Sequence, residues 1–245
     1  MSTGSSPSSP EPRCWGVLPA AGTGSRMGAE QPKQYLQLAG VTLLEHSLRA
    51  LLGCPRIAGI VVALHPQDSH AETLAVLRDA RVKTVSGGTE RSDSVLAALS
   101  HLLSWADPGD WVLVHDAARP CLQSADINRL IDAVIARDTG GILAQPIVDT
   151  VKQAAGDALV ARTLDRTILW RAQTPQMFRL GQLHQALHQA QTQGLAVTDE
   201  ASAMELAGYP VQLVAGPAGN LKVTVPADLP LAAWYLQAAA AKATV

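Results

Sequence analysis

Residues 15–35 read WGVLPAAGTGSRMGAEQPKQY and decide the expected fold. The short apolar run at 15–20 has the length and character of a buried strand, and it stops at the small residues AGTGS. We therefore predict a first strand that leads directly into a glycine-rich loop.

The glycines of this loop do not fit the two common nucleotide-binding motifs. Gly22, Gly24 and Gly28 give the spacing G-x-G-x-x-x-G, whereas the dinucleotide motif needs its third glycine one position earlier, and the Gly-Lys-Ser/Thr ending of a P-loop is absent. The loop still combines small residues, which let backbone N–H groups approach phosphate oxygens, with the cations Arg26 and Lys33. This combination indicates triphosphate binding, against the alternative of a structural turn with solvated charges.

Downstream of the loop, short apolar runs alternate with segments of helical periodicity. The apolar runs predict strands at 57–64, 82–85, 111–115 and 141–148, and later strands at 209–215 and 221–225. The periodic segments predict helices at 43–52, 67–79, 90–105, 124–137, 180–193 and 226–242, and one that opens at 198–200. Such a series of βαβ units builds an α/β fold with a mainly parallel, twisted sheet flanked by helices. Ligands bind at the carboxyl ends of its strands, so we expect loops 19–34, 86–94 and 115–121 to converge there.

The alternation of strands and helices breaks down at 149–171. Polar and apolar residues alternate in this segment, and Ala155–Gly156–Asp157 is a turn signal. We predict a hairpin-like arm over 148–171 that projects from the sheet. Residues 14–245 are otherwise expected to form a single domain, and the Ser/Pro-rich residues 1–13 a disordered tail.

Composition argues against several other classes of protein. The 245 residues are 47% hydrophobic, and 19 basic against 21 acidic side chains give a net charge of −2, so the basic footprint of a nucleic-acid-binding protein is missing. The sequence has no apolar run of about 18 residues and no secretory leader, so we expect a cytoplasmic protein that spans no membrane. Cys14, Cys54 and Cys121 are odd in number and far apart, which predicts buried thiols rather than disulfides or a zinc site.

Six segments in a fixed order carry a more specific signal. They are LPAAGTGSRMGAEQPKQY (18–35), SGGTERSDSVLAAL (86–99), VLVHDAARP (112–120), the arm strings RTLDRT and RAQTPQMF (162–167 and 171–178), VTDEASAME (197–205) and GNLKVTVPADL (219–229). Together, from about Trp15 to Tyr235, the chain resembles the 2-C-methyl-D-erythritol 4-phosphate cytidylyltransferase family of the non-mevalonate isoprenoid pathway. The resemblance implies a Rossmann-like nucleotidyltransferase fold, with CTP and a polyol phosphate as substrates and pyrophosphate as a product.

The resemblance also implies roles for individual residues. Neutralisation of phosphate charge in the transition state is expected from Arg26, Lys33, Arg166 and Lys222. CTP is expected to contact Pro19, Ala20, Ala21, Gly22, Gly24, Gly87, Gly88, Ser94 and Arg119. The polyol phosphate is expected to contact Thr150, Arg166, Thr174, Thr198 and Lys222. The carboxylate of Asp116, at the end of a strand, is expected to bind Mg²⁺, with His115 as a packing or supporting residue.

Two positions depart from the family pattern. Thr89 stands where family members often carry Asp, and Gly219 stands where an acid commonly precedes Asn220. Arg91 is expected either to reach phosphate or to pair in the surroundings of Glu90. In the family the arm interlocks with its twin in a homodimer, so residues 150 and 166 are expected to act across that interface.

Two other functions stay open at this point. A sister cytidylyltransferase that acts on ribitol 5-phosphate would share the glycine-rich loop and the Asp116 motif, although TPQMF and TDEASAME favour methylerythritol phosphate. A non-catalytic nucleotide-binding regulator on the same sheet is opposed by the joint presence of the predicted cations and Asp116. Some relatives are fused to a downstream pathway enzyme; because this chain ends soon after its last helix, we expect the monofunctional form.

Overall fold

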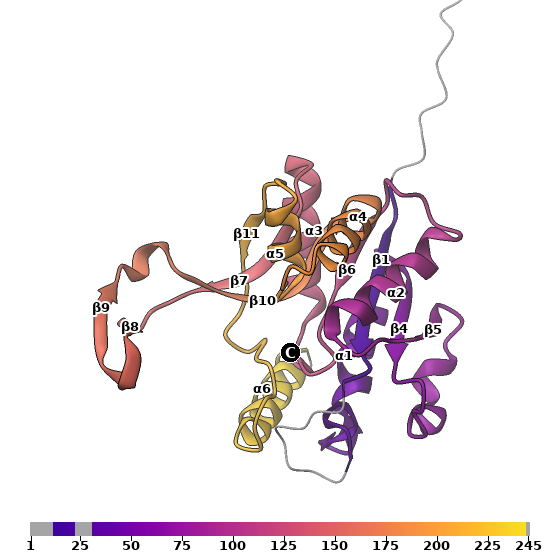
Figure 1. Cartoon of the computed structure of the whole chain (residues 1–245). Helices are drawn as coiled ribbons and strands as arrows, with labels where there is room; N and C mark the ends of the chain where they lie inside the picture. Colours follow the sequence, from indigo (N-terminus) through magenta and orange to yellow (C-terminus); the bar gives the residue numbers. More distant parts are fainter. Residues whose placement is uncertain (1–11, 23–30, 244–245) are drawn as a thin grey trace, which may run out of the picture.

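The computed structural model describes residues 12–22 and 31–243, so residues 1–11 of the expected tail lie outside the described residues. A seven-stranded sheet with the order β11-β7-β10-β6-β1-β4-β5 forms its centre (Figure 1). The strands are β1 (Cys14–Ala20), β4 (Ile57–Leu64), β5 (Val82–Ser86), β6 (Trp111–Val114), β7 (Gly141–Pro146), β10 (Trp170–Arg179) and β11 (Gln212–Ala215). The pairs β1–β4, β1–β6, β4–β5 and β7–β11 are parallel, whereas β10 is antiparallel to both β6 and β7. The predicted α/β fold with a mainly parallel sheet is confirmed.

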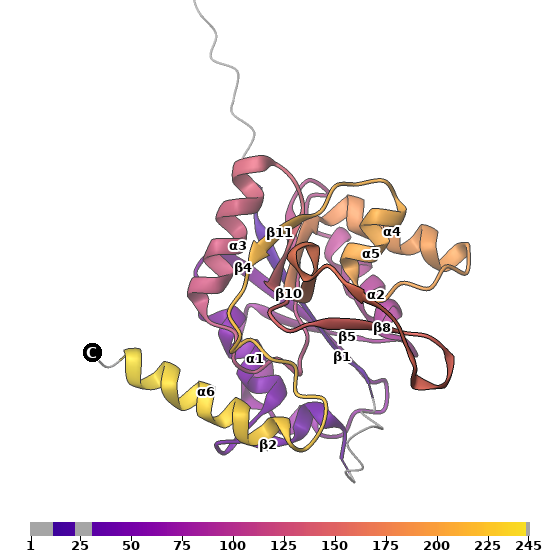
Figure 2. The same ribbon diagram turned by 90° about the vertical axis from the view of Figure 1, so that its left-hand side faces the viewer.

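Helices cover both faces of this sheet (Figure 2). They are α1 (Leu43–Leu52), α2 (Arg91–Leu103), α3 (Ser124–Arg137), α4 (Leu180–Thr192), α5 (Glu200–Leu206) and α6 (Asp228–Ala243). Leu18 and Leu113 share a core with α1 and α3, and Val17 and Val112 share a second core with α2, α4 and α5. Successive strand residues point to opposite faces, so strands that are covered on both faces must be apolar throughout.

Short elements complete the chain. The 3₁₀ turns are η2 (Lys33–Tyr35), η3 (Ala71–Thr73), η4 (Ala75–Arg78), η5 (Gly156–Ala158) and η6 (Arg166–Ile168), and a small hairpin joins β2 (Gln37–Leu38) to β3 (Val41–Thr42). Helix α1 begins where predicted because Thr42 and Glu45 form a reciprocal capping box, in which each side chain accepts from the other residue's backbone N–H at 3.2 Å. Cys14, Cys54 and Cys121 are buried free thiols, as predicted. No helix within the described residues combines the length and apolar character that crossing a bilayer requires.

The predicted helix over 67–79 is wrong. The segment forms the two 3₁₀ turns η3 and η4, and Leu74 between them is extended. The side chain of Asp68 accepts from the backbone N–H groups of His70 and Ala71, at 2.9 and 3.0 Å, which favours a turn over a continuing helix. The extended backbone lets Leu74 bury its side chain in the core under β4.

The predicted strand over 221–225 is also wrong. The backbone N–H of Val223 donates to the carbonyl of Ala118 at 2.8 Å, and those of Thr224 and Val225 donate to the carboxylate of Asp228 at 2.7 and 3.0 Å. These hydrogen bonds take the place of strand pairing. The alternation of polar and apolar residues over 221–225 therefore arises because this segment packs on the loop after β6. The fully buried side chain of Val223 anchors that packing.

The predicted hairpin over 149–171 is confirmed. Strands β8 (Val151–Ala154) and β9 (Val160–Leu164) pair antiparallel and stand away from the central sheet (Figure 1). Asp157 and Ala158 adopt positive φ angles of 58° in the turn. The arm exposes large apolar side chains, at Val148, Leu159, Val160 and Ile168. The adjoining strand β10 was not predicted, and it inserts between β6 and β7 with a register shift between Ala172 and Gln176.

We expect Leu113→Ala to destabilise the fold by about 2–5 kcal/mol, because it removes a fully buried side chain from the central strand β6 and leaves a cavity. Urea unfolding followed by circular dichroism measures the change. Leu206→Ala is the matched control: this leucine is 55% exposed on α5, and a change within about 0.5 kcal/mol is expected. Equal losses in the two variants would contradict the assigned core.

Candidate active site

A cavity of about 280 Å³ lies where the loops after β1, β5 and β6 meet, at the carboxyl edge of the sheet. Its lining is Pro19, Ala20, Ala21, Gly22, Lys33, Gln34, Gly88, Thr89, Glu90, Arg91, Ser94, Asp116, Ala117, Ala118 and Lys222. The predicted convergence of the three loops is therefore confirmed. Lys33 and Lys222, far apart in the sequence, share one cavity with Asp116.

The remaining predicted site residues have different positions. Gly24 and Arg26 lie outside the described residues. Gly87 and Arg119 adjoin the cavity, and Thr174 lies beneath Asp116. Thr198 lines a separate, smaller cavity at the start of α5. Thr150 and Arg166 are exposed on the arm, where the guanidinium of Arg166 donates to the carbonyl of Val148.

Glycine is required where the first two loops touch. A Cβ on Gly87 would lie 2.5 Å from the Cβ of Ala21 and 2.7 Å from the hydroxyl oxygen of Ser94. The same hydroxyl accepts from the backbone N–H of Gly88 and donates to the carbonyl of Glu90, both at 3.2 Å. Ser94 thus fixes the shape of the loop from below, in addition to lining the cavity.

Lys33 is the first residue of η2, and the two residues that follow it are anchored by side-chain hydrogen bonds. The side-chain amide of Gln34 donates to the carbonyl of Ala20 at 2.8 Å, and the hydroxyl of Tyr35 donates to Asp68 at 2.6 Å. Burial, together with the hydrogen bond to Asp68, raises the pKa of Tyr35 well above its usual range. Sequence reasoning missed both hydrogen bonds, because nothing in the sequence around Gln34 and Tyr35 indicates that their partners are Ala20 and Asp68.

Asp116 is the electrostatic centre of the site. Its Oδ1 accepts from Nε of Arg91 at 2.9 Å, and its Oδ2 accepts from Nζ of Lys222 at 2.9 Å and faces Nε of Arg119 at 3.6 Å. Burial raises the pKa of Asp116, but the charges of Arg91, Lys222 and Arg119 outweigh it and hold the pKa far below its usual range. The carboxylate therefore stays ionised, in a cavity whose cations suit an anionic ligand.

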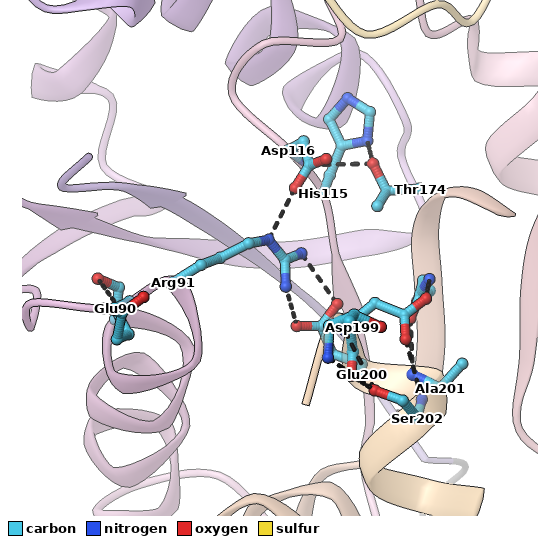
Figure 3. Close-up of polar contacts among 12 residues, drawn as sticks. Glu90, Arg91, His115, Asp116, Thr174, Asp199, Glu200, Ala201 and Ser202 are labelled. Atoms are coloured by element: carbon cyan, nitrogen blue, oxygen red, sulfur yellow. Dashed lines mark hydrogen bonds and ion pairs between the residues drawn. The ribbon is translucent and has the colours of Figure 1, made fainter. Parts of the chain in front are cut away.

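Arg91 has partners that sequence reasoning did not identify. Its guanidinium pairs with Asp116 and with Glu200 rather than in the surroundings of Glu90 (Figure 3), and its expected contact with phosphate stays a prediction. Glu200 lies in the VTDEASAME segment, where Thr198 had been singled out instead. The acidic residue at the start of a helix was the available signal, but the contact joins residues 109 apart in the sequence.

His115 and Thr174 support Asp116 from below. Because the carbonyl of Arg119 can only accept, Nε2 of His115, 3.1 Å away, carries the proton. Nδ1 of the neutral ring then accepts from the hydroxyl of Thr174 at 2.9 Å, and that oxygen accepts from the backbone N–H of Asp116 at 3.0 Å. Burial lowers the pKa of His115 to about 4, which keeps this chain of hydrogen bonds intact.

This depressed pKa predicts a loss of stability in acid. In the unfolded chain His115 binds a proton near pH 6.5, whereas in the folded protein it binds one only near pH 4. The contribution of neutral His115 to the free energy of unfolding is therefore fully present above pH 6.5, and about 3 kcal/mol is lost as the pH falls from 6.5 to 4. Urea unfolding between pH 4 and 7.5 measures the slope. His115→Gln removes the titrating group and should flatten the slope; identical slopes in both proteins would contradict the assignment.

The fit of Mg²⁺ to the site rests on a single carboxylate. No cluster of three His, Cys, Asp or Glu side chains able to hold a metal occurs within the described residues. Mg²⁺ bound beside nucleotide phosphates takes only one or two protein carboxylates, and completes its shell with phosphate oxygens and water. The ionised Asp116 on the cavity wall meets that requirement.

The sequence and the fold both have known relatives. The family model described as 2-C-methyl-D-erythritol 4-phosphate cytidylyltransferase matches residues 15–238. Proteins of that name from Pseudomonas aeruginosa and Mannheimia succiniciproducens are 51% and 52% identical, over 89% and 90% of this chain and 94% of each relative. The crystal structure of the Francisella tularensis protein of that name is 36% identical, with a TM-score of 0.78 over 91% of this chain and 99% of that chain. The chain therefore belongs to the 2-C-methyl-D-erythritol 4-phosphate cytidylyltransferase family, whose members are nucleotidyltransferases.

Proposed function

We propose that the protein transfers the cytidylyl group of CTP to 2-C-methyl-D-erythritol 4-phosphate, a step of isoprenoid precursor biosynthesis. The products are 4-diphosphocytidyl-2-C-methyl-D-erythritol and pyrophosphate. The observation that carries the proposal is that Lys33, Asp116 and Lys222, taken from three separate family motifs, line one cavity beside a glycine-rich loop. Membership of the family supplies the identity of the two substrates.

In the proposed mechanism, an oxygen of the methylerythritol phosphate attacks the α-phosphorus of CTP. The new P–O bond forms as the bond between the α-phosphorus and the bridging oxygen breaks, and the electron pair leaves with pyrophosphate. The nucleophile is already an anion, so the step needs charge neutralisation and alignment rather than a strong base. The cations that line the cavity meet that need, with Lys33 and Lys222 as the residues that neutralise phosphate charge.

The loops divide the binding of CTP between them. Backbone groups from Pro19 to Gly22 are assigned to the triphosphate, and Gly87, Gly88 and Ser94 to the cytidine. The tight contact between Gly87 and Ala21 supports this division, because it sets the two loops side by side at one end of the cavity. Thr89 and Glu90 face the same cavity, so the departure from the family pattern at Thr89 leaves the backbone contacts available.

Asp116 is the residue proposed to hold Mg²⁺. The ion would supply further neutralisation of phosphate charge. Both oxygens of Asp116 accept from cationic side chains, so Arg91 and Lys222 compete with a metal for the carboxylate. Thr174 is buried beneath Asp116, and its hydroxyl accepts from the backbone N–H of Asp116. It is better placed to orient Asp116 than to contact the polyol.

Ribitol 5-phosphate is the competing substrate. Both candidates are acyclic polyol phosphates, so the cavity accepts the phosphate of either on the same cations. Pyrophosphate release is measured with CTP and each polyol phosphate in turn. Turnover of methylerythritol phosphate supports the proposal, turnover of ribitol phosphate alone overturns it, and CTP binding without any pyrophosphate release would indicate a nucleotide-binding regulator.

We expect Lys33→Ala to lower kcat by on the order of 10²-fold, the usual cost of removing one preorganised charge from a transition state. Lys83→Ala is the matched control, since Lys83 is an exposed lysine on the edge strand β5. Steady-state pyrophosphate release measures both variants. A Lys33→Ala enzyme with wild-type turnover would remove the role assigned to this residue.

We propose further that two chains form a homodimer through the arm, with Arg166 and Thr150 reaching the partner's polyol phosphate. The apolar side chains of Val148 and Ile168, each 75% exposed, support this proposal, because an interlocking arm would cover them. Each complete site would then combine the loops of one chain with the arm of the other.

Mixing two defective variants tests this arrangement. Arg166→Ala damages the arm and Lys33→Ala damages the loop, so a mixed dimer has one intact site. After subunit exchange at equal concentrations, we expect about a quarter of wild-type turnover, since half of the dimers are mixed and half of their sites are intact. No recovery despite demonstrated exchange would show that each chain carries its own complete site.

A further inference from the structure

A buried carboxylate outside the cavity is connected to Asp116 through one side chain. Arg91 donates from Nη1 and Nη2 to the two carboxylate oxygens of Glu200, at 2.6 and 3.0 Å, and from Nε to Oδ1 of Asp116 at 2.9 Å (Figure 3). The side chain of Glu200 is 1% exposed. Glu200 does not line the main cavity, so its charge acts on the site through Arg91.

Stability alone does not account for this ion pair. Taking two charges out of water costs free energy that their mutual attraction does not fully return, and apolar replacements of buried pairs are often as stable or more stable. A charged pair in this place therefore calls for a role beyond holding α2 and α5 together.

The position of Glu200 is fixed relative to Asp116 by one strand. Gln176 on β10 donates to the carboxylate of Asp199 and accepts from the backbone N–H of Ala201, both at 2.8 Å, and so brackets Glu200 at the start of α5. Two residues earlier on β10, the hydroxyl of Thr174 accepts from the backbone N–H of Asp116. Asp116 and Glu200, the two carboxylates that Arg91 joins, are thus both positioned by hydrogen bonds to β10.

Geometry restricts what Arg91 can do between these two carboxylates. A guanidinium prefers to meet a carboxylate with two parallel N–H bonds, and Glu200 takes that double contact. Asp116 receives a single bond from Nε. Without a charged Glu200, the forked end of Arg91 would be available to Asp116 and to phosphates in the cavity that Arg91 lines.

We propose that Glu200 is a positioning residue of the transferase site, which holds the forked end of Arg91 away from Asp116 and from the bound triphosphate. This inference rests on the proposed function. Loss of the Glu200 charge makes the net charge beside the cavity more positive by one, so CTP should bind at least as tightly. The released guanidinium of Arg91 would then hold Asp116 or the triphosphate in a position that slows the transfer. The signature is a fall in kcat without a loss of CTP affinity.

Glu200→Gln tests the proposal, with Glu205→Gln, an exposed residue of the same helix, as the matched control. We expect kcat to fall about 10- to 100-fold in Glu200→Gln, the range usual for removal of a supporting partner, and to stay at the wild-type value in the control. Calorimetry should show a Kd for CTP equal to or below that of the wild type. Undiminished kcat, or a Kd that rises in step with the loss of kcat, would overturn the positioning role.

A double-mutant cycle shows whether Glu200 acts through Arg91. In the Arg91→Gln background, Glu200→Gln should change kcat by less than about threefold, because the partner through which it acts is gone. The double variant is a neutral pair without a buried unpaired charge, whereas Arg91→Gln alone leaves Glu200 without its cation, so circular dichroism first confirms that each single variant is folded before kcat values are compared. Independent, multiplying effects would overturn the proposal. A wild-type enzyme that releases no pyrophosphate would overturn the proposed function instead, which separates the two failures.

Discussion

The site depends on one carboxylate that is kept charged by its surroundings. Asp116 is almost fully buried, and burial by itself would drive it towards the neutral form. Arg91, Arg119 and Lys222 reverse that tendency. Because these cations come from α2, from the loop after β6 and from the segment before α6, the charge balance at Asp116 exists only when all three regions are folded together.

The antiparallel strand β10 gives this arrangement its rigidity. It lies between β6 and β7, and its residues Thr174 and Gln176 bond to Asp116 and to the start of α5. The side-chain amide of Asn220 donates to the backbone carbonyl of Thr174 at 2.7 Å, and the backbone carbonyl of Asn220 accepts from Arg119 at 2.8 Å, so the segment that carries Lys222 is tied to the same strand. A single strand thereby sets the relative positions of the acid and of the cations around it.

The glycine-rich loops solve a separate physical problem. Phosphate oxygens need backbone N–H groups at close range, and side chains would block that approach. The contact of Gly87 with Ala21 and Ser94 shows how closely the loops pack, and Gln34 and Tyr35 brace Lys33 beside them. Cationic side chains and small loop residues thus line one cavity at the edge of the sheet.

The sequence by itself determined the local elements and the edge at which they meet. Apolar runs located β1, β4, β5, β6 and β7, and the helical spacing of apolar residues located α1, because these signals depend on neighbouring residues. Tertiary structure decided the rest. The 67–79 and 221–225 segments have hydrogen-bond partners that override their local patterns. Strand β10 was missed for a different reason, because its Thr174–Pro175 pair interrupts the strand pattern in the sequence. No local signal identifies Glu200 as the partner of Arg91, because the two residues are 109 apart in the sequence and meet only in the folded chain.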